Sequence, residues 1–197
     1  SVQLSVADLN KSRLSGEWNM SYIYRSLTMD ECERIQEINP SQYIKRAWRE
    51  VDGVRQLIEI NYQENDWPDG YEHYLSKLKQ TINQDGCAVG AFEDTGKLVG
   101  FGTINREMFG QAYKYVLLDS LFISLEYRNK GIGKVLFQTC AETAREWGAD
   151  KIYICAGSAE DTIAFYFALG CKEAEEVNEK LYESDPRDMQ LEYPLSS

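Results

Sequence analysis

The sequence predicts a mixed α/β (α+β) domain in which a largely antiparallel central sheet carries helices on both faces. The chain has 197 residues, a length typical of one domain, and 43% of them are hydrophobic, which is enough to build a core. The turn sequences Asp52-Gly53 and Asp94-Thr95-Gly96 separate strand-like runs and therefore join antiparallel strands. Helical patterns alternate with the strands along the chain, as expected for this fold class.

The orderly pattern begins at Met20. Residues 1–19 are polar and only weakly patterned, and we interpret them as an N-terminal extension or a cloning remnant. Residues 20–197 contain no internal repeat and no low-complexity tract, so we interpret them as a single domain.

The first half of this domain begins with a strand and a short helix. Thr28 and Glu31 have the spacing of a capping box, in which a hydroxyl and a carboxylate each satisfy a free backbone N–H. The helix that they open has Cys32, Ile35 and Ile38 on one side. The expected elements are strands over 21–27, 43–51 and 54–62, this short helix, and an amphipathic helix over 71–83.

The second half contains the longest strand and the clearest helix. The run over 113–125 is the longest strand candidate, and the residues over 131–147 place their apolar side chains on one helical face. The remaining elements are strands over 87–93, 97–106, 151–155, 172–177 and 187–193, and a helix over 159–169.

Composition limits the partners. The chain has 21 Lys and Arg residues against 32 Asp and Glu residues, so its net charge of -11 disfavours nucleic acid and favours amine-bearing partners. Such a charge also simply keeps a protein soluble. The five cysteines form no CxxC pair, and with one histidine they leave too few ligands for a metal such as zinc. The sequence shows no membrane-length apolar run and no signal peptide, so we expect a cytoplasmic protein with reduced thiols and no membrane partner.

The segment over 117–134 has the pattern of an anion site: an apolar strand, a polar turn, and glycines at the start of a helix. Free N–H groups and the helix dipole attract anions there, and Gly131 and Gly133 let the chain approach a phosphate without a Cβ. Arg128, Lys130 and Lys134 add positive charge, so a pyrophosphate is the expected ligand. The Walker A pattern is absent and the Rossmann pattern is incomplete. The alternative is a helix start with no ligand.

This segment resembles the signature of a known family. The residues over 128–133, RNKGIG, are similar to the [QR]xxGx[GA] signature of the GNAT superfamily of N-acetyltransferases. The later residues over 165–171, FYFALGC, resemble the family's FYxxxGF segment, with Cys171 in place of the usual Phe. The order of strands and helices also agrees over residues 20–193. The resemblance implies a single acyl-CoA N-acyltransferase domain over 20–197.

The resemblance also implies how acetyl-CoA would bind as cosubstrate. Its pyrophosphate would contact N–H groups of the signature loop beside Arg128, and its pantetheine arm would bond the main chain near Phe122 and Ile123. Ser158 or Asp161 would stand where the family often has an Asn or Ser that touches the cofactor. The loop N–H groups belong to Asn129, Lys130, Gly131, Ile132, Gly133 and Lys134.

Two residues are candidates for the chemistry. Tyr166 matches the family's Tyr general acid, which would protonate the leaving thiolate; a buried core aromatic is the alternative. Asp119 lies within an apolar strand, where desolvation would raise its pKa towards that of a useful base; bonding a neighbouring strand is the alternative. A backbone N–H near Phe122 or Ile123 would stabilise the oxyanion. Strict alternation would place Asp119 on one face with Tyr115, Leu117, Leu121 and Ile123.

The function that follows is transfer of an acetyl group from acetyl-CoA to a primary amine of a small molecule or peptide, by direct attack in a ternary complex. Cys155 and Cys171 remain as alternative covalent nucleophiles. A non-catalytic acyl-CoA sensor is the alternative class, and a homodimer is possible. The acidic loop with Trp67 and Asp69 would suit a cationic amine, unless Asp69 merely caps the following helix with Glu72.

Overall fold

A computed structural model describes residues 21–195 and contains a seven-stranded sheet and a separate two-stranded hairpin. The predicted extension over 1–19 lies outside the described residues. Across the large sheet the strands are β1 (Ile23–Ser26), β4 (Cys87–Phe92), β5 (Leu98–Ile104), β6 (Tyr115–Ile123), β7 (Lys151–Ala156), β9 (Met189–Pro194) and β8 (Lys172–Glu173). Among these described strands, β6 and β7 form the one parallel pair, so the predicted largely antiparallel sheet is confirmed.

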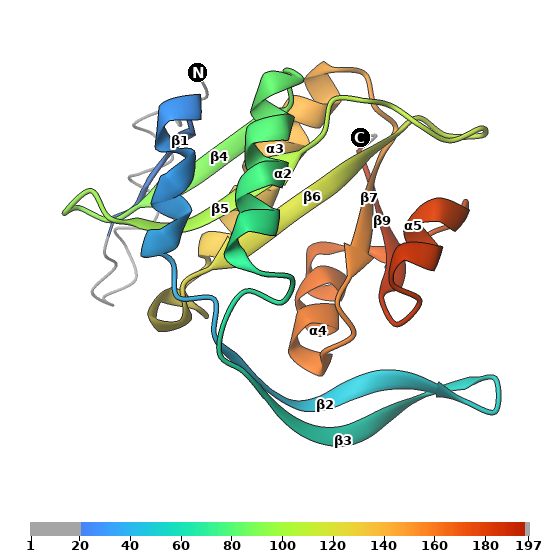
Figure 1. The fold of residues 1–197 in the computed structure, drawn as a ribbon. Coiled ribbons are helices and arrows are strands. Elements are labelled where there is room, and N and C mark those ends of the chain that lie inside the picture. The colour runs from blue at the N-terminus through green and yellow to red at the C-terminus, as the bar shows by residue number, and fades with distance from the viewer. Residues whose placement is uncertain (1–20, 196–197) are drawn as a thin grey trace, which may run out of the picture.

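Helices cover both faces of the sheet, as predicted. In Figure 1, η2 and α2 lie in front of the sheet, and α3 lies behind it. One hydrophobic core joins η2 and α2 to β4 and β5, and the other joins α3 and α4 to the strands from β4 to β9. The helices are η2 (Met29–Glu37), α2 (Tyr71–Asn83), η3 (Leu125–Tyr127), α3 (Ile132–Glu146), α4 (Glu160–Leu169) and α5 (Glu179–Ser184). No helix of the described residues is long and apolar enough to cross a membrane.

The predicted short helix is a 3-10 helix. The capping box of Thr28 and Glu31 is present at its start. Cys32, Ile35 and Ile38 are buried in the core shared with α2. Because a 3-10 helix has three residues per turn, this spacing of three places all three side chains in one line facing the core.

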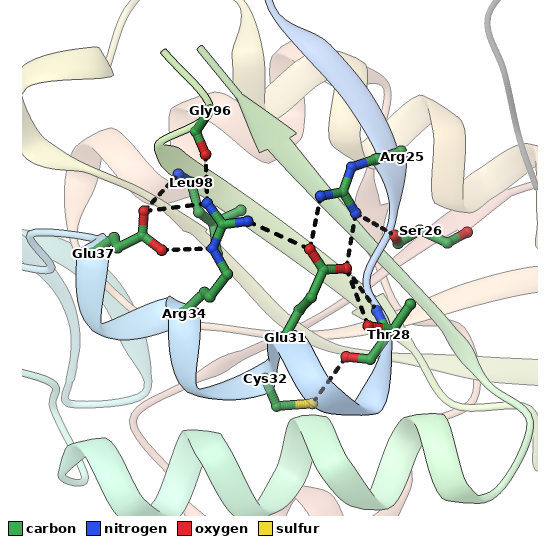
Figure 2. Close-up of polar contacts among 9 residues, drawn as sticks. All are labelled: Arg25, Ser26, Thr28, Glu31, Cys32, Arg34, Glu37, Gly96 and Leu98. Atoms are coloured by element: carbon green, nitrogen blue, oxygen red, sulfur yellow. Dashed lines mark hydrogen bonds and ion pairs between the residues drawn. The ribbon is translucent and has the colours of Figure 1, made fainter. Parts of the chain in front are cut away.

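Ion pairs attach η2 to the neighbouring strands (Figure 2). Arg25 of β1 donates from two nitrogens to Glu31 at 2.8 and 2.7 Å, and it lowers the pKa of Glu31 to about 2. Arg34 pairs with Glu37 at 2.8 Å and also donates to the Gly96 carbonyl in the β4–β5 turn. Since Glu37 accepts from the N–H of Leu98 as well, η2 is fixed to β1 at one end and to the β4–β5 turn and the start of β5 at the other.

The hairpin of β2 (Gln42–Val51) and β3 (Val54–Glu64) extends away from the large sheet and packs beside α4 (Figure 1). Asp52 and Gly53 have positive φ angles of 51° and 78°, as the predicted two-residue turn requires. Arg46 forms two hydrogen bonds with Glu160 at 2.6 and 2.8 Å. The N–H of Trp48 also donates to the Ser158 carbonyl at 2.8 Å. Strand β2 is therefore bonded to the segment that directly follows β7.

The C-terminal part differs from the prediction. The strand expected over 172–177 has only the two residues of β8, and the helix α5, capped by Asn178, was not predicted. Glu176 accepts hydrogen bonds from backbone N–H groups in the loop before β6, including those of Gln111 and Ala112. The residues of β8 that pair with β9 end at Glu173, and one further hydrogen bond joins the N–H of Ala174 to the Gln190 carbonyl at 2.9 Å.

Candidate active site

The parallel strands β6 and β7 separate halfway along their length. Their pairing ends at Leu118 and Ile154, whereas β6 continues to Ile123 paired with β5 alone. Between the Thr103–Ser120 and Ile104–Leu118 pairs, β5 advances by one residue and β6 by two. Asp119 is therefore the additional residue of a β-bulge, and the opening in the sheet begins at this bulge.

The bulge corrects the predicted surroundings of Asp119. Leu121 and Ile123 pack into the core on the α3 side, but Asp119 lies on the α2 side, where its Oδ1 is 3.5 Å from Nζ of Lys77. The same ammonium donates to the Asp119 carbonyl at 3.1 Å. Burial raises the pKa of Asp119 as predicted, and the charge of Lys77 partly opposes this shift.

The start of α3 presents free N–H groups beside this opening. Gly131 has φ +84° and precedes the helix, and the first N–H that bonds to a carbonyl of the chain is that of Val135, to Gly131 at 3.2 Å. In the described part of the chain, the N–H groups over 129–134 have no protein acceptor. Asn129, Lys130 and Lys134 are exposed there. These groups can bind a pyrophosphate.

Arg128 does not present its charge to this loop, contrary to the prediction. Its Nε donates to the Ile123 carbonyl at 2.9 Å, and its second nitrogen lies 3.4 Å from the Asn39 carbonyl. Burial lowers the pKa of the guanidinium. Arg128 therefore fixes the loop over 129–134 to the end of β6. Its contribution to an anion site is to hold this loop in place.

The end of β6 offers main-chain groups to the opening. The N–H of Ser124 donates to the Val99 carbonyl at 2.8 Å, on the β5 side. Successive main-chain groups of a strand point to opposite edges, so the groups of Phe122 also point to β5 and those of Ile123 point to the opening. Of the two residues predicted to bond the pantetheine arm, Ile123 has the suitable orientation. The ring of Phe122 packs with Trp67, Tyr74 and Phe101.

The helix α4 carries the predicted acid. Tyr166 is buried in the core on the α3 side, and this burial raises the pKa of its phenol. Its neighbour Phe165 packs on the start of α3, where a Cβ on Gly133 would lie 3.2 Å from the Phe165 ring. Asp161 is exposed in the first turn of α4, and Ser158 accepts a hydrogen bond from Arg49 at 2.7 Å. The structure therefore assigns neither residue a clear cofactor contact.

The acidic loop before α2 does not act as a cap. The N-cap of α2 is Gly70, and Asp69 instead accepts a hydrogen bond from the hydroxyl of Tyr74 at 3.0 Å. Trp67 is buried in the core between the sheet and α2, so its ring is not free to hold a ligand. The charge of Asp69 also helps to raise the pKa of Asp188, the residue directly before β9.

Sequence analysis missed Asp188 and Gln190, which line a cavity of about 510 Å³ between the hairpin and the C-terminal segment. Burial and the nearby charges of Asp185 and Asp69 raise the pKa of Asp188 to about 7. Asp188 directly precedes β9, which pairs with β7. Asp188 lies in a polar turn whose local sequence contains no motif. Its place in the cavity could be predicted only from the order of the strands, which the sequence does not give. Among the described residues no group of side chains could hold a metal ion.

Comparison with known proteins identifies the family. The model of the acetyltransferase (GNAT) family matches residues 52–171, more than half of the chain. The chain therefore belongs to the GNAT acetyltransferase family. No curated protein matches the chain significantly.

Solved structures show the same fold. Nourseothricin acetyltransferase has 18% identity and a TM-score of 0.69, with 89% of this chain and 99% of that chain covered. A streptothricin acetyltransferase from Bacillus anthracis str. Ames, in complex with acetyl coenzyme A, has 15% identity and a TM-score of 0.62 over 87% and 96% of the two chains. PaiA N-acetyltransferase from Thermoplasma acidophilum, in complex with coenzyme A, has 19% identity and a TM-score of 0.55 over 89% and 99%.

Proposed function

We propose that this chain is an acetyl-CoA-dependent N-acetyltransferase that acetylates a primary amine of a small molecule or peptide by direct attack in a ternary complex. One observation carries the proposal: the opening between β6 and β7 starts at Asp119 and lies beside the free N–H groups at the start of α3. The thioester of acetyl-CoA could therefore lie in the opening between β6 and β7 while its pyrophosphate binds at the start of α3.

The residues present fit acetyl-CoA. The N–H groups over 129–134 would bind the pyrophosphate, and the exposed ammonium groups of Lys130 and Lys134 add positive charge. The side of β6 beyond Leu118 that faces β7 has no strand partner, so its main chain can bond the pantetheine arm. When bound, acetyl-CoA supplies the activated acyl group.

The protein's own groups would then manage the protons. Asp119, raised in pKa by burial, would take the proton of the attacking amine as the new C–N bond forms. The N–H of Ile123 would stabilise the oxyanion. Tyr166, whose phenol stays protonated because burial raises its pKa, would protonate the thiolate released when the C–S bond breaks. One proton thus leaves the amine and one reaches the thiolate. The thiols of Cys155 and Cys171 take no part, because burial raises the pKa of each to about 12.

The free cysteines of the described chain agree with a reducing, cytoplasmic compartment. A non-catalytic acyl-CoA sensor is the second candidate. It would need the loop over 129–134 but neither Tyr166 nor the carboxylates near the opening.

Calorimetric titration of the purified chain with acetyl-CoA, beside ATP and NAD, tests the cofactor. We expect saturable binding of acetyl-CoA and no comparable binding of the other two, because the loop lacks the complete patterns of their sites. A folded protein that does not bind acetyl-CoA would overturn the proposal. If acetyl-CoA binds, thiol release with a panel of primary amines separates an enzyme from a sensor.

A further inference from the structure

The hairpin leaves one of its two long strands with a free edge. Strand β2 lies between β3 and α4 (Figure 1), and its outer edge is occupied by the segment after β7. The N–H of Trp48 donates there to the Ser158 carbonyl at 2.8 Å, and Ala47 forms an antiparallel bridge with Ala159. Within the described residues, β3 pairs with β2 alone. An unpaired strand edge presents N–H and C=O groups that can pair with another chain.

The register of the hairpin shows which residues of β3 face this edge. In an antiparallel pair, two residues opposite each other either bond to each other or both point away. Leu57 lies opposite Trp48, whose N–H points away from β3 to Ser158. The main-chain groups of Leu57 therefore point to the free edge. By alternation along the strand, those of Arg55 and Glu59 point there as well.

The charges along this edge are complementary to a second copy of the same edge. When two antiparallel copies of β3 pair with Leu57 opposite Leu57, Arg55 of each copy lies opposite Glu59 of the other. The same register brings outward-pointing main-chain groups opposite each other, as a hydrogen-bonded ladder requires. A shift by two residues would place a charge opposite Leu57, and a shift by four would place Arg55 or Glu59 opposite itself. The charges therefore select one symmetric register.

The side chains of β3 are available for this pairing. Within the described chain Glu59 forms no ion pair, and the pair that Arg55 forms with Glu173 lies at the surface. Val54 and Ile58 of the same strand are 59% and 36% exposed. In the selected register, Ile58 of one copy lies diagonally across from Ile58 of the other. Such cross-strand contacts bury apolar surface and stabilise a sheet.

We propose that two copies of this chain associate through their β3 strands, which joins the two hairpins into one antiparallel sheet with Leu57 at the two-fold axis. The outer edges of this sheet are the β2 strands, and each is already bonded to Ser158 of its own chain. Association therefore stops at two copies, as in a closed symmetric dimer. The inference concerns assembly and does not depend on the proposed acetyl transfer.

Analytical ultracentrifugation over a concentration series tests the assembly. We expect the wild type to sediment with twice the chain mass of 22.7 kDa. Arg55→Glu and Glu59→Arg each place like charges opposite each other, so each should raise the dimer dissociation constant by about tenfold or more. An equal mixture of the two variants should restore the dimer, because an edge with two acidic residues then faces an edge with two arginines. A defect within one chain would not be repaired by mixing.

Lys45→Glu is the matched control, since it makes the same change of charge at an exposed residue of β2 and should stay dimeric. Circular dichroism of each variant verifies the fold. A monomeric wild type, a dimer that persists in both edge variants, or a mixture that stays monomeric would each overturn the inference. A monomeric wild type that binds acetyl-CoA would leave the proposed function intact. A dimer that follows the charge pattern without binding acetyl-CoA would support the inference and defeat the proposed function.

Discussion

The phenol of Tyr166 lies in a mostly apolar environment, between Phe137 and Phe165 at ring distances of 6.4 and 5.2 Å. No hydrogen bond to a described residue engages its hydroxyl, so removal of this hydroxyl leaves no buried partner unsatisfied. An effect of its removal on turnover would therefore report chemistry and not folding.

Tyr166→Phe should lower kcat by about a hundredfold or more, the usual contribution of a general acid, with little change in acetyl-CoA affinity. Steady-state kinetics and calorimetry measure the two quantities. Tyr71→Phe, which removes a hydroxyl that donates to the Glu33 carbonyl away from the opening, is the control and should keep kcat. Full turnover in Tyr166→Phe would exclude Tyr166 as the acid.

Asp188 should make the fold less stable as the pH rises. Its pKa is raised from 3.8 to about 7 in the fold, so the folded state resists ionisation that the unfolded chain undergoes freely. Its stabilising contribution is complete below pH 3.8 and is lost as the pH rises towards 7. The charged and titratable groups around it are Asp69, Tyr74, Cys155, Asp185, Arg49 and Arg187.

Asp188→Asn should accordingly raise the free energy of unfolding at pH 8 but not at pH 4. We expect a gain of about 1–2 kcal/mol, well below the full value of the shift because water screens the partly exposed carboxylate. Chemical denaturation at both pH values measures it. Equal effects at the two pH values would show that Asp188 ionises normally in the fold.

At the scale of the element, α3 carries a matched pair of glycines. Gly131 precedes its first turn with φ +84°, and Gly148 follows its last turn with φ +80°. Neither would bring a Cβ within 4 Å of another group. A substitution thus meets the same backbone strain at both ends, but only Gly131 lies beside the free N–H groups.

Gly131→Glu should weaken acetyl-CoA binding by at least about tenfold, because it places a side chain and a negative charge at the anion site. Gly148→Glu should bind acetyl-CoA as the wild type does, while losing a similar amount of stability through its backbone, about 1 kcal/mol. Calorimetry and thermal unfolding measure both effects. Unchanged affinity in Gly131→Glu would remove the pyrophosphate from this loop.

The bulge in β6 is the element that shapes the site most. One additional residue turns Asp119 to the α2 side while Leu121 and Ile123 pack on the α3 side. The hairpin has a comparable effect, since β2 meets the end of β7 and closes one side of the cavity. Sequence patterns predicted both strands, but not this bulge or this contact.

At the scale of the whole molecule, the net charge of -11 should draw a cationic acceptor to the site. Raising the salt concentration from about 20 mM to about 500 mM shortens the screening length from roughly 20 Å to about 4 Å. We expect KM for a cationic amine acceptor to rise about threefold or more, with kcat unchanged. Initial rates over a salt series measure this. A KM independent of salt would mean that overall charge has no part in acceptor binding.

The sequence by itself determined the family, the loop over 129–134 and the elements before residue 172, because these depend on local spacing: capping, hairpin turns, helical periodicity and glycines at a helix start. Strand order and bulges depend on contacts between residues far apart in the chain. The fold therefore decided the engagement of Arg128 with Ile123, the side on which Asp119 lies, and the meeting of Asp69 with Asp188. Local sequence patterns cannot predict such long-range contacts, because these contacts form only when the strands pair.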